Sequence, residues 1–296
     1  HRILSVFLLV NCGVMSTWSA VGKNVLITGA SSGIGRELAV RYAKAGANVA
    51  LLARRFELLK TLAEECANEG VVAVPIQCDV TDRAVCAAAV AEAVQRLASI
   101  DVIILNAGMS QGCYFEDIQD LSDADYMLSL NLMGQVNVLH YAMPHIPKKK
   151  DSRIVAISSV AGCIGVPFRT IYCMSKWGLT GFCNSLRTEL IDTYGADAPQ
   201  IIVSCPPEVD TDINTSRLQF GAGKPAEFMQ SAARPVSVAG DSIMEAIQRG
   251  TRLHLFERMQ RILATLYSCI PATIDNMVIK IVKRTHIHPR AQVAKL

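Results

Sequence analysis

Six short runs rich in valine and isoleucine recur along this chain, and longer segments with helical patterning separate them. Continuous apolar runs of this length are typical of strands that are buried on both faces, as in parallel sheets. Strands that alternate with helices predict an α/β fold, a doubly wound parallel sheet with helices on both faces. We expect strands at 24–29, 48–53, 71–77, 102–107, 153–158 and 201–205, and helices at 35–45, 56–68, 83–98, 124–143 and 172–194.

Composition narrows the class of protein. A chain of 296 residues, with 51% hydrophobic and 19% charged residues, suits one large domain with a substantial core. The net charge of +3 is too small for a nucleic-acid-binding protein, so we expect no nucleic-acid partner. The cysteines form no C-x-x-C pair and no spacing predicts a metal site. We interpret them as reduced, buried side chains, with a disulfide-containing lumenal protein as the alternative.

A glycine-rich turn, TGASSGIG at 28–35, follows the first expected strand and opens a helix. Glycines let the backbone turn tightly beside a pyrophosphate, and a helix N-terminus provides amide donors for it. The alternative is an ordinary strand-to-helix loop. The position in a βαβ unit favours a dinucleotide site with Gly29, Ser31, Ser32, Gly33, Ile34 and Gly35 as contacts.

The ends of the next three strands complete this predicted cofactor site. The second strand ends at Arg54, where an NAD-specific site usually has a carboxylate for the ribose 2′-hydroxyl. An arginine can pair with a 2′-phosphate instead, so we predict NADP(H), although a surface arginine is the alternative. After the third and fourth strands we expect adenine contacts from Asp79 and Val80, and ribose contacts from Asn106, Ala107 and Gly108.

Tyr172 and Lys176 are four positions apart and share one helical face. An ammonium group near a phenol favours the phenolate, and the phenol can then exchange a proton with a carbonyl oxygen. Ser159 can bind the same oxygen, and Asn131 can hold a water near the lysine. Each residue alone has a structural alternative: a solvated helix face, a helix cap or a core amide.

Together, TGASSGIG (28–35), NAG (106–108), Asn131, Ser159 and YCMSK (172–176) resemble the short-chain dehydrogenase/reductase family. The resemblance implies a single Rossmann-type domain with a seven-stranded sheet, spanning about 23–250. It also implies hydride transfer by the Asn131–Ser159–Tyr172–Lys176 set and a homodimer. The stretch 166–190 is similar to the membrane-associated dehydrogenase/reductase member-seven branch, whose relatives are linked to steroids, retinoids and alkyl- or acyl-glycerone phosphate.

One departure from the family pattern follows the sixth strand, where Pro206-Pro207 replaces the usual Pro-Gly. A proline fixes φ and removes an N–H, so this loop is expected to have a different shape. Pro206, Val209 and Thr211 align with cofactor-contacting positions, and the resemblance also implies cofactor contacts for Tyr172 and Lys176. 3-Ketosphinganine reductases resemble the chain here, so that substrate stays open. A non-catalytic NADPH-binding or scaffold protein is the competing class.

Both ends of the chain bear on location. Residues 3–21 are nearly uncharged and almost long enough to span a bilayer, so 1–22 is interpreted as an anchor, a signal peptide or a remnant of either. Residues 251–296 are apolar and basic, as at membrane surfaces. We therefore expect membrane association, at the endoplasmic reticulum. The ending Ala294-Lys295-Leu296 resembles a peroxisomal signal, which is the alternative.

These observations predict an NADP(H)-dependent oxidoreductase. It would interconvert a carbonyl and a secondary alcohol on a small, apolar, lipid-like substrate, with Tyr172 as general acid and base.

Overall fold

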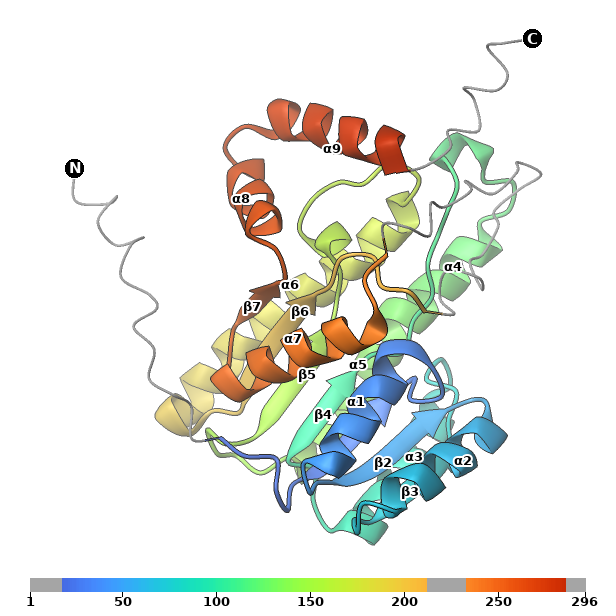
Figure 1. Cartoon of the computed structure of the whole chain (residues 1–296), viewed down its shortest axis with the longest axis vertical. Helices are drawn as coiled ribbons and strands as arrows, with labels where there is room; N and C mark the ends of the chain where they lie inside the picture. The colour runs from blue at the N-terminus through green and yellow to red at the C-terminus, as the bar shows by residue number, and fades with distance from the viewer. Residues whose placement is uncertain (1–17, 212–232, 286–296) are drawn as a thin grey trace.

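The protein, represented by a computed structural model, is described for residues 18–211 and 233–285. Its centre is a seven-stranded parallel sheet with the strand order β3-β2-β1-β4-β5-β6-β7 (Figure 1). The order reverses between β1 and β4, which creates a crevice at the carboxyl ends of the strands. The strands are β1 (Asn24–Thr28), β2 (Asn48–Ala53), β3 (Ala73–Gln77), β4 (Val102–Leu105), β5 (Arg153–Ile157), β6 (Gln200–Cys205) and β7 (Leu253–Leu255).

Helices cover both faces of the sheet and separate two cores. One core packs α1 (Gly33–Lys44), α2 (Phe56–Ala67) and α7 (Val236–Arg249) against one face of the sheet. The other packs α3 (Arg83–Leu97), α5 (Gly134–Ala142) and α6 (Thr170–Tyr194) against the opposite face, with α4 (Ser122–Leu128) beside α6. The predicted single α/β domain with a doubly wound seven-stranded sheet is therefore confirmed.

Strand alternation explains why both cores form. Leu26 of β1 points into one core, and its neighbours Val25 and Ile27 point into the other. All three side chains are fully buried. Successive side chains of a strand lie on opposite faces, so a strand covered on both faces needs apolar residues throughout. That requirement produces the unbroken valine and isoleucine runs of the sequence.

The structure corrects several predicted boundaries. The fourth and fifth strands end at Leu105 and Ile157, so Asn106 and Ser158, which were expected at their ends, lie in the loops that follow. The third strand ends at Gln77 as expected but begins at Ala73, two residues later than predicted. The helix expected at 124–143 is interrupted by a π-helical turn over Ser129–Met133. The resemblance implied a seventh strand, but its position was not predicted, because β7 is very short and lacks a valine and isoleucine run. Helix α7 was not predicted either.

Two C-terminal helices, α8 (Arg258–Tyr267) and α9 (Pro271–Thr285), stand together at one end of the molecule (Figure 1). Their inner residues Leu263, Ile274 and Val278 form a small core with Ile164 and Phe168 of the β5–α6 connection. Their other faces expose large apolar side chains: Met259, Ile262, Leu266, Ile270, Met277, Ile279 and Ile281. These seven residues are called the outer α8–α9 face below.

The two ends of the chain fall mostly outside the described residues. The candidate anchor at 3–21 is described only from Trp18 onward; Trp18 is buried, and its indole N–H donates to the Asp151 carbonyl over 2.8 Å. Within 18–211 and 233–285, no helix has the length and apolar character needed to cross a membrane. The tripeptide Ala294-Lys295-Leu296 lies outside the described residues.

Candidate active site

The glycine-rich turn between β1 and α1 has the close packing that a dinucleotide site requires. Gly29 and Gly33 adopt φ of +66° and +56°, a region that side chains other than glycine rarely occupy. A Cβ at Gly35 would lie 2.4 Å from the Gly29 carbonyl oxygen. The Asn106 side-chain amide donates to the carbonyls of Thr28 and Gly29 over 2.9 and 3.2 Å. The turn is thus fixed against the end of β4, and it opens toward the N-terminus of α1.

Two arginines follow β2 beside this turn. The Arg55 guanidinium donates to the hydroxyls of Ser31 and Ser32, with the shortest contact at 2.6 Å. Arg54 donates to the Tyr126 hydroxyl of α4. The sequence predicted a phosphate contact for Arg54 alone; the structure places the guanidiniums of Arg54 and Arg55 at the glycine turn's end of the site. The adjacency of the two arginines was the signal available.

The remaining predicted cofactor residues border the same space from three other loops. Asp79 follows β3 and accepts from the backbone N–H and hydroxyl of Thr81 over 3.0 and 2.8 Å. Val80 is buried, and a Cβ at Gly134 would lie 2.6 Å from it, so these two residues fix α5 beside the loop. On the β6 side, a Cβ at Gly33 would lie 3.1 Å from Thr211.

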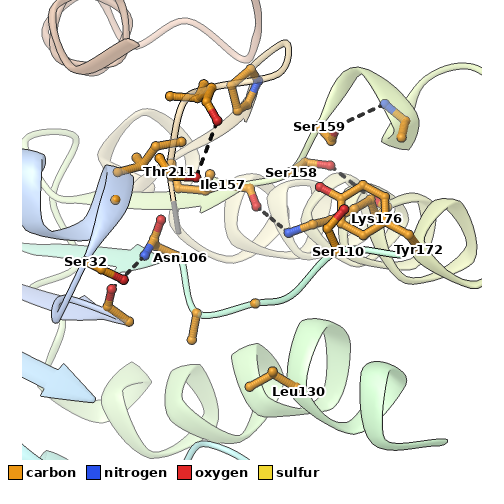
Figure 2. Close-up of a pocket in the computed structure, with 18 of the residues that line it drawn as sticks. Ser32, Asn106, Ser110, Leu130, Ile157, Ser158, Ser159, Tyr172, Lys176 and Thr211 are labelled. Carbon is orange, nitrogen blue, oxygen red and sulfur yellow. Dashed lines mark hydrogen bonds between the residues drawn. The ribbon is translucent and has the colours of Figure 1, made fainter. Parts of the chain in front are cut away.

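Tyr172, Lys176 and Ser159 converge at the other end of the space, as Figure 2 shows. Tyr172 and Lys176 lie in the first turns of α6, and the Lys176 ammonium donates to the Ile157 carbonyl over 2.9 Å. Its nitrogen is 5.7 Å from the centre of the Tyr172 ring. Ser159 lies two residues beyond β5, where its hydroxyl accepts from the Ala161 N–H at 3.2 Å, and it is close enough to Tyr172 to influence the pKa of the phenol. Ser159 therefore serves as a cap and also faces the phenol.

Burial shapes the acid–base chemistry of this pair. It raises the pKa of Tyr172 above its usual value, while the nearby Arg169 guanidinium and the hydrogen bond with Ser159 oppose part of that rise. Burial also lowers the pKa of Lys176 to about 8. The sequence argument expected a lowered phenol pKa because of the neighbouring ammonium. In the protein alone, desolvation of both groups is the stronger effect.

Asn131 lies in the π-helical turn and is fully buried. Its side-chain oxygen accepts from the Met109 N–H at 2.8 Å, and its amide donates to the Met109 carbonyl at 2.9 Å and to Ser175 at 3.2 Å. A Cβ at Gly108 would lie 3.1 Å from that oxygen and 3.7 Å from the Lys176 nitrogen. Asn131 therefore fixes the loop after β4 directly behind the lysine. π-Helical turns of this kind often mark functional sites.

Sequence reasoning missed four residues that shape the substrate side. Gln111 is fully buried, and its side-chain oxygen accepts from the N–H groups of Ile171 and Tyr172 at 2.9 and 3.1 Å, which caps α6. Arg169 contacts Ser110 and Glu208 from the residue before α6. These contacts join loops that are distant in the sequence, so no local pattern predicted them.

One cavity of about 630 Å³ connects the glycine turn with the Tyr172 end. Two predicted site residues, Gly35 and Asn131, do not line it and instead lie behind its walls. The donors at its ends, an open helix N-terminus, two arginines and a phenol–ammonium pair, fit an NAD-type cofactor. Among the described residues, no group of histidine, cysteine and acidic side chains could hold a metal ion. The other predicted residues line the cavity: Gly29, Ser31, Ser32, Gly33, Ile34, Arg54, Asp79, Val80, Asn106, Ala107, Gly108, Ser159, Tyr172, Lys176, Pro206, Val209 and Thr211.

Comparison with known proteins agrees with this geometry. Residues 23–220 match the family model described as short chain dehydrogenase. The 11-beta-hydroxysteroid dehydrogenase-like 4A of Arabidopsis thaliana is 39% identical over 175 residues, covering 59% of this chain and 58% of that protein. Dehydrogenase/reductase SDR family member 7 of Homo sapiens is 37% identical over 204 residues, covering 66% of this chain and 58% of that protein. The match thus spans less than two thirds of the length of these relatives.

Solved structures agree on the fold. A short chain dehydrogenase/reductase of Burkholderia phymatum, in complex with NAD, gives a TM-score of 0.76 at 20% identity, covering 87% of this chain and 96% of that one. An alcohol dehydrogenase of Thermococcus sibiricus, complexed with 5-hydroxy-NADP, gives 0.66 at 22% identity, covering 78% and 94%. The chain belongs to the short-chain dehydrogenase/reductase family of oxidoreductases. Within that family it resembles the member-seven branch.

Proposed function

We propose that the protein is an NADP(H)-dependent oxidoreductase that interconverts a carbonyl and a secondary alcohol on a small, apolar, lipid-like substrate. The observation that carries this proposal is the single cavity described above. Tyr172, Ser159 and Lys176 lie at one of its ends, and the glycine turn with two arginines lies at the other. A dinucleotide bound along the cavity would connect the two ends.

A bound nicotinamide cofactor supplies or accepts the hydride. In carbonyl reduction, Tyr172 donates a proton to the carbonyl oxygen, and in the reverse direction its phenolate accepts one. The Ser159 hydroxyl holds the same oxygen, and the buried Lys176 ammonium provides positive charge beside the phenol. Asn131 binds the backbone of the loop after β4, and the missing side chain of Gly108 lets that loop lie close to the Lys176 ammonium.

The preference for NADP(H) rests on charge. Strand β2 runs directly into Arg54 and Arg55, and no carboxylate stands at its end to bind a ribose hydroxyl and repel a phosphate. Guanidinium groups bind phosphate through paired hydrogen bonds. Arg55 already lies within hydrogen-bond distance of two serines of the glycine turn, where a 2′-phosphate would add a stronger acceptor.

The apolar substrate class and membrane association are supported by the C-terminal helices. Val160 and Val166 line the cavity and also pack against the small core under α8 and α9. The substrate side of the cavity is therefore continuous with an apolar cap whose outer α8–α9 face is exposed. Arg258, Arg261 and Lys280 on these helices suit an anionic lipid surface. We place the protein at the endoplasmic reticulum, with the peroxisome as the alternative.

Vesicle binding tests this assignment. The protein should cosediment with vesicles of phosphatidylcholine and phosphatidylserine, and Ile262→Glu with Leu266→Glu on the outer α8–α9 face should reduce that binding several-fold. Leu58→Glu, an equally exposed position on α2, is the matched control. Equal binding by all variants would refute a role of this face.

The homodimer stays a prediction. Helix α6 exposes Trp177, Ile191 and Tyr194, which supports an interface along it. Light scattering after size exclusion should give twice the 32.1 kDa chain mass. A monomer at micromolar concentration would refute it.

Turnover decides the function itself. Purified protein should oxidise NADPH in the presence of pooled lipid carbonyls: a keto-steroid, retinal, an acyl-glycerone phosphate and 3-ketosphinganine. Tyr172→Phe should abolish turnover and retain NADPH binding, and NADH should be the poorer cofactor. Saturable NADPH binding without turnover on any carbonyl would favour the non-catalytic binding protein, with Pro207 as the first residue to exchange. Better turnover of small polar carbonyls would refute the lipid-like substrate class.

A further inference from the structure

Arg169 joins three parts of the candidate active site. It precedes α6 directly, three residues before Tyr172, and its guanidinium carbon lies 5.6 Å from the centre of the Tyr172 ring. One of its nitrogens donates to the Ser110 hydroxyl over 2.6 Å. Another lies 3.8 Å from a carboxylate oxygen of Glu208. The guanidinium is therefore held on two sides while it faces the phenol.

These two partners come from loops on either side of the reacting centre. Ser110 follows β4 and is buried, and Glu208 belongs to the loop after β6 that begins with Pro206-Pro207. The backbone of that loop is pinned as well, because the Arg234 N–H donates to the Glu208 carbonyl over 2.9 Å. The side chains of Arg169 and Glu208 are only 15% and 20% exposed, so solvent screens their charges weakly.

We propose that Arg169 is a further positioning residue for the reaction: with Ser110 and Glu208 it holds a second positive charge, beside that of Lys176, against the ring of Tyr172. This rests on the proposed function, because it concerns the phenol assigned there as acid and base. Glu208 partly offsets the charge of Arg169, so the carboxylate tunes the field at the phenol as well as anchoring the loop.

The groups around Tyr172 show which charges act on it. Burial raises the pKa of Cys173, and the hydrogen bond with Cys163 together with burial raises that of Cys205, so both thiols are neutral near pH 7. Among the influences that lower the pKa of Tyr172, the charge of Arg169 is the largest. Removing the Arg169 charge should therefore raise the pKa of Tyr172 further, and removing the Glu208 charge should lower it.

Six charged or titratable groups surround the phenol. They are Arg169, Cys173 and Lys176 from α6 and the residue before it, Cys205 from β6, Cys113 from the loop after β4, and Glu208 behind Arg169.

Direct titration of Tyr172 tests the proposal without any substrate. A fluorinated tyrosine replaces tyrosine throughout the full chain, and its lower intrinsic pKa brings the titration into a range where the fold survives. Fluorine NMR follows each ring, and Tyr172→Phe identifies the signal. Arg169→Gln should raise the pKa of Tyr172 by about one unit, as expected for loss of a charge at this distance. Arg169→Lys should restore most of the wild-type value.

Glu208→Gln removes a negative charge, so it should shift the pKa of Tyr172 in the direction opposite to Arg169→Gln and lower it by roughly half a unit. The ring of Tyr126, which contacts Arg54 instead, is the internal control and should not move. A Tyr172 titration unchanged by both exchanges would overturn the proposal, as would shifts in the same direction. If Arg169→Gln does not fold, Glu208→Gln decides alone. The expected shifts without turnover on any carbonyl would refute the proposed function, and would leave standing only the arrangement of charges around the Tyr172 phenol.

Discussion

Gly162 lies where the loop that carries Ser159 meets α6, the helix that carries Tyr172 and Lys176, and adding one methyl group there should disturb both. An ideal Cβ at this position would lie 2.4 Å from the Ser158 hydroxyl and 2.9 Å from the Lys176 carbonyl oxygen. The Ser158 hydroxyl is itself bonded to that carbonyl and to Thr180, over 3.3 and 3.1 Å. The carbonyl belongs to the backbone of α6 and cannot rotate away. Gly162→Ala must therefore move the loop away from the helix.

The expected cost follows from overpacking a buried contact. Inserting a methyl group into a well-packed site typically costs about 1–3 kcal/mol. A loss of ~2 kcal/mol in the free energy of unfolding should lower Tm by about 4–8 °C in a domain of this size. The moved loop carries Ser159, so we expect kcat to fall by about tenfold or more, since small displacements of catalytic groups have effects of this order. The glycine turn lies at the other end of the cavity, so the Kd for NADPH should stay the same.

Calorimetry, NADPH fluorescence titration and turnover on an accepted carbonyl measure these three quantities in one preparation. The matched control is Gly181→Ala, five residues beyond Lys176 on α6, where nothing is within 4 Å of the added Cβ. That exchange should raise stability by up to about 1 kcal/mol, because alanine is the better helix former. A Gly162→Ala protein with unchanged Tm and kcat would refute the reasoning that glycine is required for the approach of loop and helix.

Three further predictions follow from charge. Arg55→Gln should weaken NADPH binding about tenfold and leave NADH binding unchanged in calorimetric titration, because one contact to the 2′-phosphate is lost. Equal losses of affinity for both cofactors would contradict a role of Arg55 in phosphate binding. Arg36→Gln, on the exposed surface of α1, is the control. Lys176→Met should abolish turnover yet raise Tm at pH 7, because burial lowers the lysine pKa from 10.5 to about 8 and the folded state therefore binds that proton more weakly than the unfolded state does. For the same reason, the stability of the wild-type protein should rise between pH 8 and 10.5, where the folded state has lost this proton and the unfolded state still holds it. A lower Tm in that variant would show that the ammonium stabilises the fold. Burial lowers the pKa of His254 from 6.5 to about 4. The free energy of unfolding should therefore fall by about 3 kcal/mol in total as the pH drops from 6.5 through 4. His254→Gln should make this pH dependence shallower when the free energy is measured by urea unfolding.

The sequence predicted much of the fold because a parallel sheet requires local signals. Both faces of β1, β4 and β5 are covered, so those strands had to be continuous apolar runs that could be found without the structure. Their C-terminal ends were placed one or two residues too far, because Gly29, Asn106 and Ser158 follow the apolar runs without a local signal that stops the strand. Strand β7 has only three residues, and it is a strand because β6 offers it an open edge.

The candidate site divides in the same way. The glycine turn and the Tyr172–Lys176 spacing depend on φ values and on one helical turn, which are properties of a few consecutive residues, so the sequence by itself determined them. The partners of those residues depend on which loops the sheet order brings together at the carboxyl ends of the strands. The hydrogen bond of Gln111 with the Tyr172 N–H, and the contacts of Arg169 with Ser110 and Glu208, join residues that are 39 or more positions apart. The burial that raises the phenol pKa depends on packing on every side. Such contacts leave no local pattern, because the free energy that fixes them is gained only when the distant segments have already packed, and so only the tertiary structure decided them.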